Sequence, residues 1–158
     1  MRILTINSKA DEKILRAKCA PFEVGSLTKT ELRALTKEMR QTMRNVLGVG
    51  LAANQIGISK QFFVAESEGK FYTVFNPKIE KTFGEPVEME EGCLSVPGLR
   101  GTVKRYEKVL LTGVDQNGKK LKIKAWGLLA HIFQHETDHL AGKLYLDKAS
   151  QVSKVEGS

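Results

Sequence analysis

The chain has 158 residues, of which 41% are hydrophobic and 27% charged, the composition of an ordinary globular protein with one domain. No apolar run approaches the roughly 20 residues of a membrane-spanning helix, and the N-terminus has no signal-peptide pattern, so we expect a cytoplasmic protein without membrane contact. The net charge of +7 would suit RNA, but the lysines are scattered without interleaved aromatic residues, so specific nucleic-acid binding is not expected.

The first predicted element is a helix that follows residues 1–27, which hold only short apolar pieces. Thr28 and Glu31 have the spacing of a capping box, in which a hydroxyl and a carboxylate satisfy free amides at the start of a helix. Gly48 is a natural stop. Between them the apolar residues have helical spacing: Leu32, Leu35, Met39, Met43, Val46 and Leu47.

Strands joined as hairpins are predicted next. Residues 61–65 and 71–75 flank a turn at 68–69, and the Asn-Pro pair at 76–77 is expected to end the second strand.

A second hairpin is predicted further along the chain. Residues 78–90 indicate another extended piece, and 91–101 indicate a loop. Strands over 109–115 and 119–125 then flank Asn-Gly at 117–118, a strong hairpin signal because both central residues tolerate positive φ.

A second helix is predicted over 127–141, with Gly142 closing it. We therefore expect an α+β fold with mainly antiparallel sheets around this helix and one further helix towards the N-terminus. Residues 1–148 would form a single domain. Residues 149–158 are polar and weakly patterned, and they would form a short flexible tail.

All three histidines of the chain lie in this second helix, in the stretch HIFQHETDHL at 131–140. His135 and His139 are four residues apart, so they lie on one face and can bind one metal ion. Glu136 is displaced from that face but can act on a water as general base, as an H-E-x-x-H pattern implies. Apolar neighbours indicate burial, which disfavours a surface helix with fortuitous histidines.

His131 adds a third histidine at the same four-residue spacing. The helix face drifts by about 40° every four residues, so three ligands from one straight helix do not converge on one tetrahedron. We therefore interpret His131 as a pocket or surface residue beside the site.

The third metal ligand must come from elsewhere in the chain. No histidine follows His139, and nothing around Asp147 is typical of a site. Cys93 lies beside a glycine in EGCLS, where a predicted loop suits a thiolate ligand. The alternative for Cys93 is the common fate of a free cysteine, a small buried residue. Cys19 has no such context and is expected to be structural, without a disulfide.

A third stretch, GVGLAANQ at 48–55, contains four small residues that let another backbone approach closely. Gln55 then offers a neutral amide donor. From the spacing alone, a functional role and a plain transition from helix end to strand are equally supported.

Together these stretches resemble the peptide deformylase family, whose motifs are G-Φ-G-Φ-A-A-x-Q, E-G-C-L-S and Q-H-E-x-D-H, where Φ is apolar. The chain has GVGLAANQ at 48–55, EGCLS at 91–95 and QHETDH at 134–139, in the same order and without a mismatch. The resemblance covers roughly residues 1–147.

The resemblance implies a metal-dependent hydrolase that removes the N-formyl group from the initiator methionine of nascent polypeptides and releases formate. Cys93, His135 and His139 would bind one divalent ion. Fe²⁺ is the expected native metal, and Zn²⁺, Ni²⁺ or Co²⁺ would substitute for it.

Three residues would carry the catalysis that the resemblance implies. Water activated at the ion would attack the formyl carbon, with Glu136 as general base and then general acid. The Gln55 side-chain amide and the Leu94 backbone N–H would stabilise the oxyanion.

The resemblance also implies a substrate that pairs as an added strand with backbone at 49–50 and 94–98. For Arg100, contact with the peptide backbone and an ordinary solvated position are equally supported. Glu91, Gln134 and Asp138 would be structural supports. The candidate substrate-binding residues are Val49, Gly50, Gly92, Arg100, Leu128 and Ile132.

Many bacterial members continue into a long C-terminal helix that docks on the ribosome, whereas here the chain ends soon after residue 147. Transient ribosome contact is therefore expected by another route, if at all. The compact form is similar to phage-encoded members, which would act in the cytoplasm of an infected host. A zinc endopeptidase and a non-catalytic metal-stabilised binding module are the alternative functions.

Overall fold

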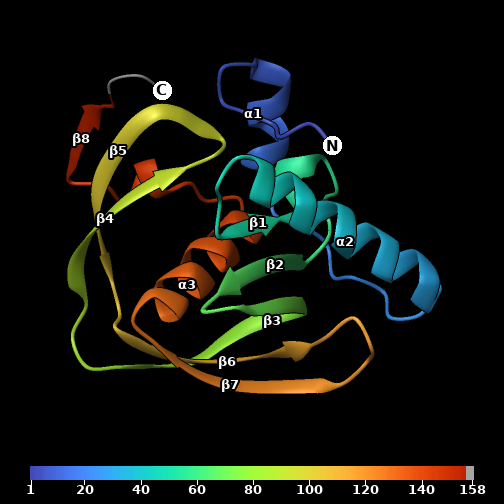
Figure 1. Ribbon diagram of the computed structural model, residues 1–158. Helices are drawn as coiled ribbons and strands as arrows, with labels where there is room; N and C mark the ends of the chain where they lie inside the picture. The colour runs from blue at the N-terminus through green and yellow to red at the C-terminus, as the bar shows by residue number, and fades with distance from the viewer. Residues whose placement is uncertain (156–158) are drawn as a thin grey trace.

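Helix α3 (Leu128–Leu140) lies in the middle of the molecule, with antiparallel sheets on two sides (Figure 1). The structure is a computed structural model, and it describes residues 1–155. The other elements, in chain order, are α1 (Lys9–Leu15), α2 (Lys29–Asn45), β1 (Gly50–Ala52), the 3₁₀ helix η1 (Ala53–Ile56), β2 (Phe62–Ser67), β3 (Lys70–Phe83), β4 (Val87–Cys93), β5 (Val96–Arg105), β6 (Lys108–Val114), β7 (Lys120–Trp126), the 3₁₀ helix η2 (Tyr145–Asp147) and β8 (Gln151–Lys154).

One sheet has five strands in the order β1-β2-β3-β6-β7, and the other has three in the order β4-β5-β8. All the strand pairs within them are antiparallel. The expected α+β class is confirmed. The described residues hold three α-helices where two were expected, because α1 was not predicted.

Within residues 1–155, no helix is both long and apolar enough to cross a membrane.

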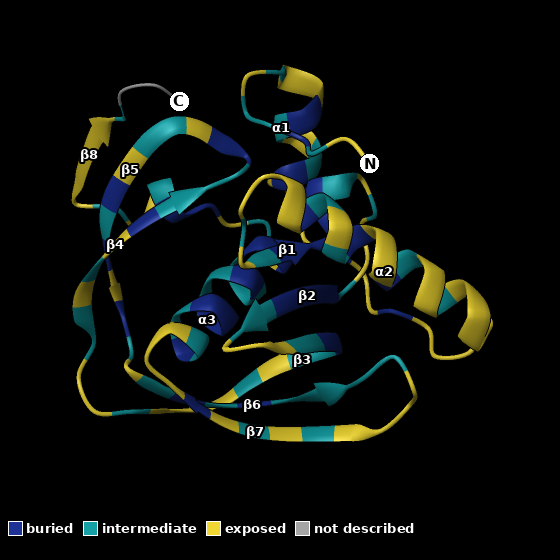
Figure 2. Cartoon of the chain, in the orientation of Figure 1, coloured by how far each residue is buried: buried dark blue, intermediate teal, exposed yellow. Residues whose placement is uncertain are grey.

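Helix α3 is held by the five-stranded sheet. Its Ala130, Phe133 and Leu140 are buried in one cluster with Phe63 and Val74 of the sheet. The ring centroids of Phe63 and Phe133 are 5.8 Å apart. Figure 2 shows that most of α3 is enclosed, so its polar side chains are fixed in a packed interior.

Helix α2 begins with the predicted capping box. The Glu31 N–H donates to Thr28 Oγ1 over 3.1 Å, and the Thr28 N–H donates to Glu31 Oε1 over 2.9 Å. Met39 and Met43 are buried against Phe62 and other apolar residues of the sheet. The opposite face of α2 is exposed, as its amphipathic pattern predicts (Figure 2).

Strand β3 does not end at residues 76–77, as the Asn-Pro pair predicted. It runs on to Phe83 through a register shift against β6, and Asn76 adopts a φ of 52° there. The shift accommodates a proline, which has no N–H for a regular ladder. The Asn76 side chain instead binds the backbone of Phe22, accepting from its N–H over 2.8 Å and donating to its carbonyl over 3.0 Å.

The loop predicted over 91–101 is also wrong. Strand β4 reaches Cys93, a turn at Leu94 and Ser95 follows, and β5 begins at Val96. The glycines and proline of this stretch lie within a hairpin. The glycines suit it because they have no side chain and let other atoms approach closely. A Cβ on Gly101, for example, would lie 3.0 Å from the Ala149 side chain.

The end of the chain was expected to be irregular, yet residues 151–154 form β8 and pair with β5 at 99–102. Every residue of β8 is exposed, so the strand has no buried face that an apolar alternation could reveal. The last three residues of the predicted tail lie outside the described residues. The second hairpin forms as predicted, but with a loop of residues 116–118 in which Gly118 alone has positive φ.

Candidate active site

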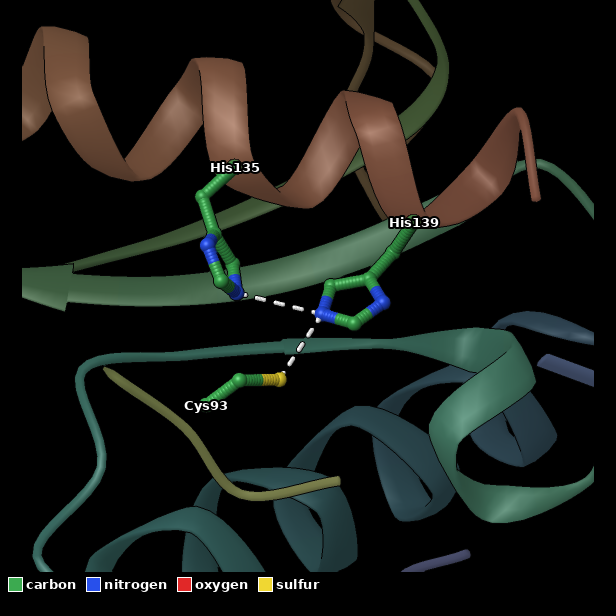
Figure 3. A group of neighbouring side chains, drawn as sticks. All are labelled: Cys93, His135 and His139. Atoms are coloured by element: carbon green, nitrogen blue, oxygen red, sulfur yellow. Dashed lines mark hydrogen bonds between the residues drawn. The ribbon is translucent and has the colours of Figure 1, made fainter. Parts of the chain in front are cut away.

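The structure brings Cys93, His135 and His139 together, with the cysteine at the end of β4 and both histidines on α3 (Figure 3). The Cys93 Sγ and His139 Nε2 atoms are 3.2 Å apart, and the two Nε2 atoms are 3.1 Å apart. All three ligand atoms lie within 4.8 Å of one another. One thiolate and two imidazoles form a donor set suited to a borderline divalent metal.

The two ligand rings differ in protonation. Burial opposes a charge on His135, but Glu136, Cys93 and Glu91 outweigh burial and raise the pKa of His135 well above its ordinary value. The Nδ1 atom of His135 donates to Glu91, so its Nε2 atom is the one that faces His139 and can take an ion in place of a proton. Burial, reinforced by the neighbouring His135, holds the pKa of His139 well below its ordinary value. A neutral imidazole is the form that ligates. The residues present therefore fit a resident metal ion.

Glu91 lies behind this group and is 4% exposed. Arg105 donates to it twice, from Nε over 2.9 Å and from Nη2 over 2.8 Å. Burial opposes its charge, but hydrogen bonds from Arg105, His131 and His135 outweigh burial and hold the pKa of Glu91 well below its usual range. Glu91 thus does more than support a loop, because it orients a member of the Cys-His-His group.

His131 does not join the three ligand atoms, in agreement with its interpretation as a flanking residue. Its Nε2 atom lies 2.5 Å from Glu91 Oε2, and its ring lines the cleft. Arg105 was not singled out in the sequence. Its role depends on a partner 14 residues away across a hairpin, and no local pattern marks it.

Glu136 is 4% exposed, and among residues 1–155 its Oε1 atom has no hydrogen-bond partner. Burial raises its pKa to about 7. Its other oxygen lies against the backbone of β1, where a Cβ on Gly50 would be 2.6 Å from Oε2. The glycine at position 50 therefore makes room for the carboxylate, which lines the same cleft as His135.

Gln55 lies in η1, and its amide orientation is fixed by its contacts. Its Oε1 accepts from the Ala52 N–H over 2.9 Å, and its Nε2 donates to Ser95 Oγ over 3.0 Å. The same Nε2 lies 3.8 Å from Cys93 Sγ. Leu94, the next residue after Cys93, occupies the turn and lines the cleft.

The N-terminal segment connects Gln55 to Ser95, the residue after Leu94, and the sequence did not indicate that. The Leu4 N–H donates to the Gln55 carbonyl over 2.7 Å, and the Ile6 N–H donates to the Ser95 carbonyl over 3.0 Å. Residues 1–7 carry no motif, so only the tertiary structure reveals this link.

A cleft of about 590 Å³ opens over the group. Ile132 is buried in its wall, whereas Leu128 and Val49 are 58% and 46% exposed at its edge. Arg100 donates from Nε to Glu90 over 2.7 Å, on the exposed side. The six candidate substrate-binding residues all line this cleft: Val49, Gly50, Gly92, Arg100, Leu128 and Ile132.

Strand β1 is the last strand of its sheet, and among residues 1–155 it pairs with β2 alone, which leaves its other edge open for pairing. The facing segment at 94–98 is less open than expected. The Gly98 carbonyl already accepts from the Val155 N–H over 2.9 Å.

The remaining polar residues of the motifs hold α3 in place. Gln134 donates to the Tyr106 carbonyl over 2.8 Å and accepts from its N–H over 2.9 Å. Asp138 accepts from Arg105 Nη1 over 2.6 Å. Cys19 is buried in the core, and Asp147 pairs with Arg16, so neither joins the metal-binding group.

Comparisons with known proteins agree with these motifs. The family model described as polypeptide deformylase matches residues 2–155. The peptide deformylase of Halothermothrix orenii is 44% identical over 156 residues, which cover 98% of each chain. That of Symbiobacterium thermophilum is 44% identical over 158 residues, covering 98% of this chain and 70% of the relative.

Solved structures give the same result. The peptide deformylase of Synechococcus elongatus, crystallised in complex with actinonin, is 38% identical with a TM-score of 0.86, over 96% of this chain and 79% of that one. A probable peptide deformylase from Synechococcus phage S-SSM7 is 37% identical with a TM-score of 0.85, over 94% and 99% of the two chains. A phage protein is thus among the similar solved structures. The chain belongs to the polypeptide deformylase family of enzymes.

Proposed function

We propose that the chain removes the N-formyl group from the initiator formyl-methionine of nascent polypeptides and releases formate. One observation carries the proposal. The buried carboxylate of Glu136, whose Oε1 atom has no hydrogen-bond partner among residues 1–155, lies at a cleft beside the group Cys93, His135 and His139. The names of the relatives support the same reaction. The substrate implies a cytoplasmic reaction and a transient contact with the ribosome.

Cys93, His135 and His139 would hold one divalent ion, with Fe²⁺ as the proposed native metal and Zn²⁺, Ni²⁺ or Co²⁺ as substitutes. When bound, the ion supplies Lewis-acid activation of the formyl carbonyl and of water. Because the described residues offer three donors rather than four, a bound ion would keep a position free for water or substrate, as a catalytic rather than structural site requires.

Glu136 is the proposed general base and acid. It takes a proton from the attacking water as the new C–O bond forms at the formyl carbon. It then delivers that proton to the amine nitrogen as the C–N bond breaks, so that formate and a free N-terminal amine leave. Burial raises its pKa to about 7, close to the operating pH, where one group serves best in both directions.

Gln55 and Leu94 are the proposed oxyanion donors. The Ala52 N–H and Ser95 hydroxyl fix the Gln55 amide in the protein itself, so that its N–H group faces Cys93 before substrate arrives. Donors that are already oriented stabilise developing charge without a reorganisation cost. The Leu94 N–H lies next to Cys93 in the chain and would act from the turn.

The peptide would add as a strand to the open edge of β1, at 49–50. Backbone pairing carries most of such contacts, which explains tolerance of the sequence that follows methionine. The methionine side chain would lie among Val49, Leu128 and Ile132, while Gly92 and Arg100 would contact its backbone. Because Gly98 already pairs with residue 155, the second side of the cleft would contribute from residues before it.

The test is metal analysis and formate release on anaerobically purified protein, with and without added Fe²⁺ or Ni²⁺. We expect about one ion per chain, and turnover of a formyl-methionyl peptide without cleavage of an unformylated or internally blocked peptide. Cleavage of internal peptide bonds would support the endopeptidase alternative. Stoichiometric metal without any turnover would support a metal-stabilised binding module.

A further inference from the structure

The carboxylate of Glu91 receives four hydrogen-bond donors, two on each oxygen. Oε1 accepts from Arg105 Nη2 over 2.8 Å and from His135 Nδ1. Oε2 accepts from Arg105 Nε over 2.9 Å and from His131 Nε2 over 2.5 Å. An ionised carboxylate has about four acceptor sites, so this buried group is fully satisfied.

His131 lies one turn before His135 on α3, so both rings reach Glu91 from the same helix. Its side chain is 15% exposed, on the wall of the cleft. Arg105 cannot supply the missing donor in its place, because its Nη1 group is bound to Asp138 over 2.6 Å. His131 is therefore the one donor, among the described residues, that holds Glu91 Oε2 from the cleft side.

We propose that His131 is a positioning residue: through Glu91 it fixes the ring of His135, and so sets how tightly Cys93, His135 and His139 hold their metal ion. Without this donor, Oε2 is only half satisfied, and the carboxylate turns towards solvent in the cleft. Oε1 then leaves its alignment with His135 Nδ1. The inference rests on the metal site of the proposed function, but it requires no particular substrate.

Two substitutions separate hydrogen bonding from packing. In His131→Gln the side-chain amide can place an N–H where Nε2 of the imidazole lies, whereas His131→Leu fills similar space without a donor. Metal affinity is measured for each purified chain by competition with a chelator, using Co²⁺. The absorption bands of bound Co²⁺ report the geometry of the thiolate and imidazole ligands.

We expect His131→Leu to weaken Co²⁺ binding about 10-fold, with altered absorption bands, and His131→Gln to restore most of that loss, as is usual for residues that orient metal ligands. Equal affinity of His131→Leu and the wild type would overturn the proposal. If His131→Leu does not fold, His131→Asn replaces it, because its shorter amide does not reach Glu91. Thermal unfolding of the metal-free chains identifies any variant that lost metal through unfolding.

A double-mutant cycle with Glu91→Gln tests the route. If His131 acts through Glu91, His131→Leu changes Co²⁺ affinity little in the Glu91→Gln background. The same 10-fold loss in both backgrounds would show that His131 acts independently of Glu91 and would refute the mechanism. Formate release by the wild-type chain is measured separately. Its absence would contradict the proposed function while leaving these affinity differences intact.

Discussion

Helices α2 and α3 bury side chains for different reasons. α2 lies on the outside and buries an apolar stripe that includes Met39 and Met43. α3 lies inside, yet three of its buried side chains are polar: Gln134, Glu136 and His139. Burying such groups lowers stability unless each has a partner, and one oxygen of Glu136 has none among residues 1–155. The comparison indicates that α2 buries side chains mainly for stability, whereas α3 also buries Glu136 and His139, the residues proposed for catalysis and metal binding.

The largest expected effect is on turnover, from Glu136→Gln. We expect formate release to fall about 1000-fold, because the amide cannot accept the proton from water. Metal content is expected to stay stoichiometric, because Glu136 is outside the Cys-His-His group. Thermal unfolding should show a chain at least as stable as the wild type, since the amide removes a buried ionisable group. Full turnover in this variant would disprove the general-base assignment.

The next effect is on stability, from Met43→Ala in α2. Met43 is fully buried, so its truncation should lower the free energy of unfolding by about 3 kcal/mol. Urea unfolding measures the change. Lys37→Ala, at an exposed position of the same helix, is the control and should leave stability nearly unchanged. Turnover per folded molecule should be retained. A large loss of turnover would contradict the interpretation that α2 serves stability and not catalysis.

The third substitution is at Gly50, where packing sets the position of the Glu136 carboxylate. A Cβ there would lie 2.6 Å from Glu136 Oε2, the end of a side chain, so the carboxylate rather than the backbone should move. We expect Gly50→Ala to lower kcat about 100-fold, which is the cost of a displacement near 1 Å at a reacting group. Metal content should be unchanged. A variant that keeps its kcat would mean that Glu136 tolerates the displacement.

The smallest effect is expected at the start of α2. Thr28→Ala removes the hydroxyl that caps the helix, which should lower the free energy of unfolding by about 1 kcal/mol. The control is Thr30→Ala, an exposed threonine within the first turn that has no capping contact. Formate release at a temperature well below unfolding should not differ among the wild type and the two variants.

Local signals account for most of what the sequence predicted correctly. The capping box at Thr28 and Glu31 depends on residues three apart, and Gly118 supplies the positive φ of its hairpin loop. The spacing of His135 and His139 depends on one helical turn. Each of these features is decided within a few residues, so no knowledge of the tertiary structure is needed to recognise it.

Long-range contacts account for what the sequence did not reveal. Arg105 becomes part of the site only because β5 pairs with β4, and Leu4 contacts Gln55 only after the N-terminal segment packs against η1. The part of the β4–β5 hairpin at 91–101 was predicted as a loop, because its glycines indicate flexibility in isolation but allow close packing in the sheet. Gly92, for instance, faces the Arg100 guanidinium, 3.2 Å from where a Cβ would lie.

Strand β8 has a practical consequence for anyone who attaches something to this chain. It pairs with β5, and Val155, which follows it, lines the cleft. An affinity tag or fluorescent label at the C-terminal end would follow, within a few residues of sequence, a residue that lines the cleft where the peptide is proposed to bind. An acidic tag there would alter the approach of substrate without replacing any residue of the cleft. Kinetic comparisons between laboratories would then depend on which end of the chain carries the tag.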